Sequence, residues 1–446
     1  MKGKSGFGDP WLWIGCALYA IVLTWLGWVK YETHHNLVDF GIFTQTAASA
    51  FGCFCNGPEG SHWAFHFSPI LYLPGALLLI WNSPLVMIAL PAIACALVAP
   101  PVYAIVRART DIGAARLAGL VALLYPPLAG LAFVDFHENA FAPAAIAWLL
   151  WAFDVGYLGV AAIAALAALA VKEDQAIFLA VAGGFGAWLY RADTRRARFA
   201  LGVAIAGVAA LVAFFVLIQP HANASPTWLP DRFYAWTGDD VHALFFGGIL
   251  SRLGFFALAF APLAFVPFRS RWMWLAALPL AEVLFSRMST TFTMGTHYAG
   301  AWAGYVLIAF AFGIAVLPKP RRALWWALAL TLVVFVAANP LHPGLNLRAV
   351  EPRDRELDAY LLTLPPNLSV STQEEVYTHL ALTNPGATLF PESPTIPVMT
   401  CDVIVDFAFP ESPRLVEYAP ALRLRSAGIV RSRCRNDVDW VPGPPT

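Results

Sequence analysis

The chain has 446 residues, of which 59% are hydrophobic and only 13% are charged, and its formal net charge is zero. Soluble domains contain roughly 45–50% apolar and about 25% charged residues, so this composition, with a mean hydropathy of +0.64, excludes an ordinary soluble protein. We expect a polytopic membrane protein. The neutral balance of charge argues neither for nor against an acidic partner, and we expect no nucleic-acid partner.

The apolar segments predict an all-α membrane bundle of about eleven helices. The first segment, Trp11 to Val29, is long enough to span a bilayer, and no small-residue cleavage site follows it, so we expect a retained helix and not a signal peptide. The expected spans are residues 11–29, 84–106, 117–133, 139–153, 158–171, 175–190, 199–218, 250–268, 272–286, 298–317 and 323–338. The apolar piece Pro69 to Trp81 is too short, and we interpret it as interfacial or re-entrant.

Basic residues predict how the chain is oriented. They cluster before the first span and in four later connections, at Lys2/Lys4, Arg107/Arg109/Arg116, Arg191/Arg195/Arg196/Arg198, Arg269/Arg271 and Lys319/Arg321/Arg322. Because positively charged loops stay in the cytoplasm, eleven spans place all five clusters inside. The prediction is a multi-pass plasma (inner) membrane protein with a cytoplasmic N-terminus and an exterior C-terminus. It also assigns the turn from Asp154 to Gly159 to the cytoplasm, although no basic residue holds it there.

The other face of the membrane then collects the unusual polar residues. The first exterior loop, residues 30–81, carries Asp39 and His66 between strongly apolar regions. The short exterior turns contribute the remaining candidates, which are Asp135, His137, Glu138, Lys172, Glu173, Asp174, His297 and Tyr298. Ionisable groups that converge at one membrane face predict a functional site.

Each of these turns also has a plainer interpretation, because exterior turns must be polar somewhere and most are simply solvated. Lys172, Glu173 and Asp174 are the hardest to explain in that way, since apolar runs flank them directly and three charges so close to hydrocarbon need partners. The set also includes hard oxygen and imidazole donors that could hold a divalent cation, although without a compact ligand spacing. The metal candidates are Asp39, His66, Asp135, His137 and Glu138.

The composition changes after residue 338. Residues 339–446 are rich in Pro and charge, with a helix-like stretch from Arg353 to Leu364 and short β-type runs at Leu368 to Ser371, Val403 to Phe407 and Gly428 to Arg431. Such alternation predicts a small exterior α/β domain beside a transmembrane domain of residues 1–338. With no nucleotide or catalytic motif, its expected role is that of a lid, an acceptor-binding module or a partner-binding module.

The cysteines give two further expectations. Cys53 and Cys55 are too close in sequence for an easy mutual bridge. Cys401 and Cys434 both lie in the exterior tail, where an oxidising compartment would allow them to pair.

A series of short motifs resembles a known family. In chain order they are D-F-G-I-F-x-Q, H-F-S-P-I-L-Y-L, Y-P-P-L, D-F-H-E-N-A-F-A-P, V-K-E-D-Q-A and H-Y-A-G, and they cover roughly residues 35–318. Together they resemble the prokaryotic predicted membrane proteins catalogued as domain of unknown function 2079. In layout that family is similar to the C-type (GT-C) glycosyltransferases, which have a catalytic acid in the first exterior loop and use polyprenyl-phosphate-linked sugars.

The resemblance implies a GT-C-like fold and a set of roles. Asp39 matches the first-loop acid and would act as the general base, the segment from His66 to Tyr72 matches the loop that binds the donor phosphate, and Lys172 matches a basic residue after the fifth helix. Two departures bear on the metal and the phosphate contacts. Asp39 is followed by Phe40 and not by a second acid, and a His stands where the aminoarabinose-type transferases have a Lys.

The predicted function is therefore transfer of a sugar from a polyprenyl-phosphate donor to an exterior acceptor, with the lipid-linked donor and membrane lipids as partners. Two alternatives stay open. A transporter or flippase would use the charged groups as an ion relay, although the sequence shows no internal repeat. A non-catalytic envelope scaffold would retain the layout without the chemistry.

Overall fold

The protein is described from a computed structural model, which covers residues 7–222, 233–234, 248–341, 348–390, 400, 402–406 and 409, and the backbone of residues 429–435 and 439–442. It divides into two compact units, which we describe separately. The first unit comprises Met1–Trp25, Trp63–Ile70 and Ile88–Pro343, and the second comprises Leu26–His62, Leu71–Met87 and Gly344–Thr446. The predicted division after residue 338 stays a prediction.

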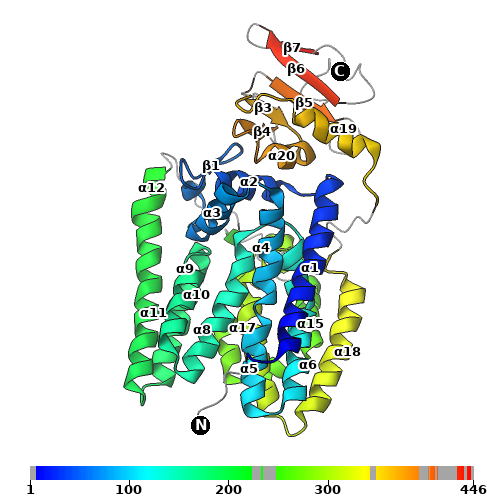
Figure 1. The fold of residues 1–446 in the computed structure, drawn as a ribbon. Coiled ribbons are helices and arrows are strands. Elements are labelled where there is room, and N and C mark those ends of the chain that lie inside the picture. The colour runs from blue at the N-terminus through cyan, green and yellow to red at the C-terminus, as the bar shows by residue number, and fades with distance from the viewer. Residues whose placement is uncertain are drawn as a thin grey trace. The chain divides into compact units, whose positions relative to one another are not determined.

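Helices make up the first unit (Figure 1). Their bounds, with those of helices that begin or end in the other unit, are α1 Pro10–Glu32, α4 Pro84–Ala96, α5 Ala99–Arg109, α6 Ile112–Leu123, α7 Pro126–Phe133, α8 Ala142–Val155, α9 Leu158–Leu169, α10 Glu173–Leu189, α11 Thr194–Val212, α12 Gln219–Ala222, α15 Ile249–Phe260, α16 Ala277–Phe285, α17 Ala299–Ala315 and α18 Pro320–Ala338. A π-helical stretch, η4 Ala213–Ile218, joins α11 to α12. Short 3-10 turns are η1 His62–Ala64, η2 Pro69–Leu71, η3 Glu138–Phe141, η6 Ala261–Leu263, η7 Val266–Arg269, η8 Arg271–Ala276 and η9 Ser289–Phe292.

Each of the eleven expected spans contains a helix, but several are broken. Within the described residues, four helical stretches are long and apolar enough to cross a membrane, namely Pro10–Glu32, Pro84–Arg109, Thr194–Ala222 and Pro320–Ala338, and the bent pair α6 and α7 would make a fifth. Proline explains part of the difference, because it cannot donate the backbone hydrogen bond that a helix interior needs. Pro262 and Pro267, for example, lie in the 3-10 turns that replace the end of the expected span 250–268.

Helix α17 forms the centre of the first unit. Every residue from Ala299 to Ile314 is buried, as expected for a helix that is apolar on all sides. Gly300 and Gly304, one turn apart, let the backbones of Asn139 and Pro143 approach so closely that a Cβ atom on either glycine would clash with them. Small residues at this spacing are typical of tight helix packing in membranes, and here they fix η3 and the start of α8 against α17.

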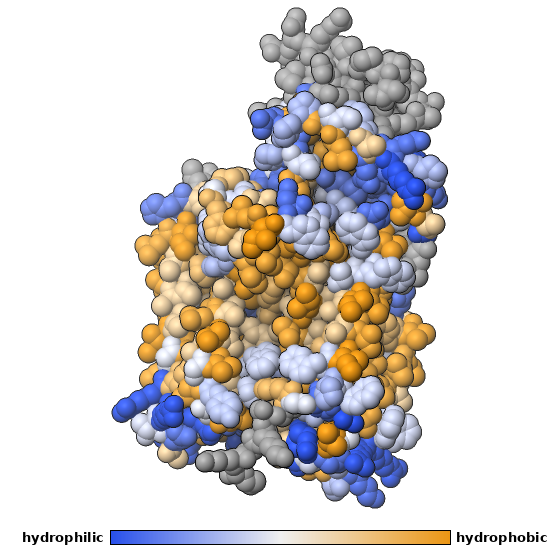
Figure 2. All heavy atoms as spheres, in the orientation of Figure 1, coloured by the Kyte–Doolittle hydropathy of each residue, from blue (hydrophilic) through white to orange (hydrophobic). Residues whose placement is uncertain are grey.

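Ion pairs join several connections at one end of the first unit. Asp154, in the last turn of α8, accepts from Arg109 at 2.6 Å through its carboxylate and from Arg196 at 2.9 Å through its backbone carbonyl. Arg321 pairs with Asp111 at 2.7 Å. The connections that carry Arg109, Arg196 and Arg321 therefore lie at the same end as the turn that begins at Asp154. Figure 2 shows hydrophilic residues gathered at this end and hydrophobic residues over the sides of the helices.

The second unit contains a mixed five-stranded sheet of β3 Val370–Thr372, β4 Ala387–Leu389, β5 Asp402–Asp406, β6 Ile429–Arg435 and β7 Asp439–Pro442. The order is β4-β3-β5-β6-β7, with β4, β3 and β5 parallel and the last two strands antiparallel. Helices α19 Pro352–Leu361 and α20 Glu374–Leu380 belong to the same segment. These elements overlap the helix and the three strands predicted for the tail. A short hairpin pairs β1 Cys55–Asn56 with β2 Gly60–Ser61.

Two helices from the first predicted loop, α2 Val38–Ala48 and α3 Tyr72–Ile80, also belong to the second unit. Ile42 of α2 is part of a buried core with residues of α19, α20 and the sheet. The Gln45 side chain donates to the carbonyl of Ala387 at 3.1 Å and accepts from the Tyr377 hydroxyl at 2.8 Å. Part of the predicted first exterior loop is thus built into the C-terminal unit.

The cysteine expectation for the first loop was wrong. Cys53 and Cys55 form a disulfide, with only Phe54 between them. The bridge is possible because the chain turns at Phe54, whose φ of 50° lies in the left-handed region. The predicted pairing of Cys401 with Cys434 concerns side chains outside the described residues.

Candidate functional site

Four connections of the first unit bring most of the predicted site residues together. They are the segment from η1 to η2, the connection from α7 to η3, the junction of α9 and α10, and the start of α17. The first is anchored by its backbone, since the N–H of Ile70 donates to the carbonyl of Ala170 at 2.7 Å. We call the group formed by His66, His137, Glu138, Lys172, Glu173 and His297 the polar cluster.

His66 and Glu173 form one pair of the polar cluster. The ring Nδ1 of His66 lies 2.9 Å from one carboxylate oxygen of Glu173, and the N–H of Phe67 donates to the other at 2.9 Å. Glu173 is the first residue of α10, where the helix dipole favours a negative charge. Burial disfavours the carboxylate, but His66 and Lys172 outweigh it and lower the pKa of Glu173 to about 2. Burial and Lys172 oppose protonation of His66, yet Glu173 raises the pKa of His66 above its usual value.

Glu138 is the buried acid of the polar cluster, with no exposed surface. One carboxylate oxygen lies 2.7 Å from His137 Nδ1, and the other lies 3.9 Å from Lys172 Nζ. Burial disfavours the ammonium of Lys172, but the carboxylates of Glu138 and Asp174 outweigh it and raise the pKa of Lys172 above its usual range. Lys172 is therefore a permanent positive charge in a site from which water is largely excluded.

Two histidines lie face to face beside this charge. The rings of His137 and His297 stack with centroids 3.8 Å apart. Burial is the largest cause that lowers the pKa of both rings well below the usual value, and the charge of Lys172 adds to it. Both rings are thus neutral at pH 7. The structure brings His297 to the polar cluster although it lies 159 positions after Glu138 in the sequence.

The remaining predicted residues of the first unit lie next to the polar cluster. Tyr298 follows His297, with ring centroids 4.2 Å apart. Asp135 is buried two residues before His137. Burial raises the pKa of Asp174 to about 6 in spite of Lys172.

The prediction did not include Glu282, which lies on α16 within electrostatic reach of Asp174 and Lys172. A single acid inside the apolar run A-A-L-P-L-A-E-V-L-F was the sequence signal for it.

Asp39 belongs to the second unit. That it shares one functional site with the polar cluster therefore stays a prediction. It lies in the first turn of α2 and is half-buried. The neighbouring motif positions have packing roles, because Phe40 is buried and Gly41 lies against the Tyr377 ring, where a Cβ atom would clash. Asp39 is the acid of this motif. Binding of a divalent cation by Asp39, His66, Asp135, His137 and Glu138 also stays a prediction.

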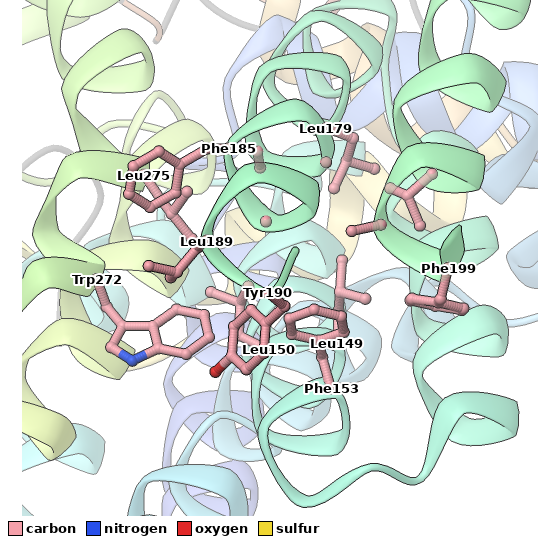
Figure 3. Close-up of a pocket in the computed structure, with 15 residues that line it drawn as sticks. Leu149, Leu150, Phe153, Leu179, Phe185, Leu189, Tyr190, Phe199, Trp272 and Leu275 are labelled. Carbon is pink, nitrogen blue, oxygen red and sulfur yellow. The ribbon is translucent and has the colours of Figure 1, made fainter. Parts of the chain in front are cut away.

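An apolar pocket lies elsewhere in the first unit. It has an empty volume of about 440 Å³ between α8, α10, α11 and η8, and Leu150, Leu179, Leu189, Tyr190 and Trp272 are among its lining residues (Figure 3). None of the predicted site residues lines it. It is therefore separate from the polar cluster.

Comparison with solved structures shows which fold the chain has. ArnT from Cupriavidus metallidurans bound to undecaprenyl phosphate superposes with a TM-score of 0.55 at 11% identity, over 96% of this chain and 99% of that chain. The apo state of the same protein gives 0.50 at 12% identity, over 91% and 94%. AglB from Archaeoglobus fulgidus, in complex with an inhibitory peptide and a dolichol-phosphate, gives 0.42 at 14% identity, over 97% and 76%.

The protein therefore has the GT-C fold of polytopic membrane glycosyltransferases, as the sequence resemblance implied. The chain belongs to the family described as "Predicted membrane protein (DUF2079)", whose model matches residues 34–412. No curated protein matches the sequence.

Proposed function

We propose that this protein transfers a sugar from a polyprenyl-phosphate donor to an acceptor on the exterior face of the membrane. The observation that carries the proposal is the state of Lys172. Its ammonium is 3.9 Å from Glu138, close enough for charge pairing but too far for a hydrogen bond. Its N–H donors can therefore turn to an incoming phosphate, and a largely buried ammonium binds phosphate more strongly than an exposed one. The GT-C fold, shared with an ArnT that binds undecaprenyl phosphate, supports the same ligand class.

The proposed reaction needs a base for the acceptor and a positive charge for the leaving group. The acceptor hydroxyl oxygen attacks the anomeric carbon of the sugar, and its proton passes to the Asp39 carboxylate. The bond between the anomeric carbon and the phosphate oxygen breaks, and the polyprenyl phosphate leaves with its negative charge stabilised by Lys172 and by protonated His66. A divalent cation could share that stabilisation, but no step depends on it.

The proposal includes the topology. We propose eleven crossings with the N-terminus inside and the C-terminal α/β domain outside, because the five basic clusters then share the cytoplasmic face. Two contacts of Asp154 support this, namely the ion pair with Arg109 and the hydrogen bond from Arg196 to its backbone carbonyl, since they hold this turn beside two of the basic clusters. Reporter fusions at Arg195 and at Thr446 should report opposite sides of the membrane, and the same side for both would refute the topology.

The test of the reaction is a transfer assay on the purified full-length protein in nanodiscs. The donors are a panel of radiolabelled sugars linked to undecaprenyl phosphate, and the acceptors are supplied as an envelope-lipid extract. Wild type should transfer label from one donor, and Asp39→Asn should lower the rate by about 10² to 10⁴ while the protein still inserts and melts normally. Full activity of the Asn variant would remove Asp39 as the base. Movement of donor across the bilayer without transfer would favour a flippase instead.

A further inference from the structure

A second group of metal-type side chains lies in the second unit and takes no part in the proposed transfer. His34 comes from the connection between α1 and α2, Asp358 from α19 and His379 from α20. Asp358 Oδ1 lies 3.1 Å from His34 Nε2 and 2.8 Å from His379 Nδ1. Both histidine side chains are almost fully buried, whereas the carboxylate of Asp358 is 35% exposed. Segments more than 300 residues apart in the sequence thus converge on one carboxylate oxygen.

When the His379 ring is neutral, the nitrogen that faces Asp358 carries no proton. A neutral imidazole has one N–H, and the other ring nitrogen carries a lone pair. The Nε2 of His379 lies 3.0 Å from the backbone carbonyl of Tyr31, which can only accept, so the N–H is at Nε2. The lone pair at Nδ1 then faces a carboxylate oxygen at 2.8 Å, and two acceptors at that distance need a cation between them.

His34 reaches the same carboxylate through its Nε2. That nitrogen lies 3.1 Å from Asp358 Oδ1, so it carries a hydrogen bond to Asp358 in one tautomer and a lone pair for a metal in the other. Its Nδ1 lies 3.6 Å from Asp354, a carboxylate that Arg348 holds in place at 2.6 Å. The rings of His34 and His379 stack with centroids 3.9 Å apart, so protonating both would place two positive charges face to face.

Two imidazole nitrogens and one carboxylate oxygen therefore converge, with all three atoms within 4.8 Å of one another. Zinc binds imidazole nitrogen and carboxylate oxygen at roughly 2.0–2.2 Å in tetrahedral geometry, which places neighbouring donor atoms about 3.3 Å apart. The observed separations of 2.8 and 3.1 Å are somewhat shorter than that value, so an ion would move the side chains slightly apart. The exposed side of Asp358 gives an ion a way in and leaves a fourth position for water.

The second ring nitrogen of His379 is held as it is in known metal sites. Metal-binding histidines usually donate their other N–H to a carbonyl or a carboxylate, which fixes the orientation of the ring. His379 does so to the carbonyl of Tyr31, and the second ring nitrogen of His34 lies 3.6 Å from Asp354. His34 also has a φ of 56°, a conformation uncommon for a residue with a side chain, which turns its ring toward Asp358.

We propose that His34, Asp358 and His379 bind one divalent transition metal, best matched by zinc, which ties α19, α20 and the connection after α1 together. The site belongs to the second unit and is independent of the proposed transfer reaction. A failed transfer assay would leave it standing, and the reverse also holds.

The test uses full-length protein stripped of metal by chelation and then titrated with Zn²⁺ or Co²⁺. The wild type should bind one more ion per chain than His379→Ala, and its Co²⁺ form should show the strong visible absorption of a four-coordinate site. His379→Ala and Asp358→Asn should both lose that ion and that absorption, with affinity lowered by more than about 100-fold, since even an indirect partner of a ligand contributes 10- to 100-fold.

His35→Ala is the matched control, because His35 is adjacent in sequence but its Nδ1 contacts the Thr33 carbonyl, and it should bind like wild type. Melting curves of the metal-free proteins show whether each variant folds. Asp358→Asn keeps the size of the side chain, so it still tests the site if His379→Ala does not fold. Equal ion stoichiometry in wild type, His379→Ala and Asp358→Asn would overturn the proposal. So would a wild type that binds no ion, in which a proton alone joins the three side chains.

Discussion

Gly300→Ala tests whether the packing of α17 holds the polar cluster in place. A Cβ atom at Gly300 would lie 2.4 Å from the backbone oxygen of Asn139, about 1 Å short of the 3.4 Å at which ordinary contact begins. Asn139 follows Glu138 directly, so a shift of η3 by that amount moves the buried carboxylate away from His137 and Lys172. Overpacking costs about 1–3 kcal/mol, and the helix preference of Ala over Gly returns at most about 1 kcal/mol. We expect a net loss of roughly 1–2 kcal/mol.

The expected loss of function is larger than the loss of stability. A displacement of about 1 Å at a reacting group can lower a rate by roughly 10²-fold, so transfer should fall by about that factor while the protein still folds. Thermal melting and the transfer assay measure the two effects separately. Gly304→Ala, which meets Pro143 one turn further from the polar cluster, should lose similar stability but keep more activity.

Gly184→Ala is the control for helix preference, since no atom lies within 4 Å of the added methyl group, and it should be neutral or slightly stabilising. If Gly300→Ala melted and transferred sugar like wild type, the clash would be relieved elsewhere, and α17 would not position the polar cluster.

Two further variants test other parts of the structure. Asp9 is buried and accepts two hydrogen bonds from Arg116, at 2.8 and 3.0 Å, and these lower its pKa below the usual 3.8. A lowered carboxyl pKa stabilises the fold above the unfolded value and is lost as pH falls, so Asp9→Asn should melt earlier at pH 7 by a margin that shrinks below about pH 4; a constant margin would contradict this. Gln45→Leu leaves the Tyr377 hydroxyl and the Ala387 carbonyl without their partner, at about 1–3 kcal/mol for each buried group. We expect a clearly lower melting temperature, and an unchanged one would refute the role of Gln45 as a link between α2 and the sheet.

Composition and local pattern predicted much of this structure. Apolar segment length located the helices, and the motif series predicted the GT-C fold. The orientation that the basic clusters predict stays a prediction. Lys172, Glu173 and Asp174 could be singled out because three charges between apolar runs cannot be left without partners near hydrocarbon. The structure supplies those partners as Glu138 and His66.

The rest depends on contacts between distant segments, which local patterns do not encode. Gln45 is a plain helical residue in the sequence, and its role appears only once Tyr377 and Ala387 are packed around it. His34 likewise becomes a metal-type ligand only beside Asp358 and His379. The sequence pattern predicted fewer helix breaks than the structure has. A hydropathy pattern registers the apolar side chains around Pro262 and Pro267, but not the backbone hydrogen bonds that these prolines cannot donate.

The most direct test of the proposed function is lipid-phosphate binding at Lys172. Undecaprenyl phosphate and undecaprenol share the same chain, so native mass spectrometry of the full-length protein with each lipid isolates the contribution of the phosphate. Charge-assisted hydrogen bonds contribute about 1.5–3 kcal/mol, so Lys172→Met should weaken undecaprenyl phosphate binding by roughly 10- to 100-fold and leave undecaprenol binding unchanged. Lys319→Met, at the exposed start of α18, should match wild type. Equal binding of both lipids by wild type and by Lys172→Met would contradict the proposal.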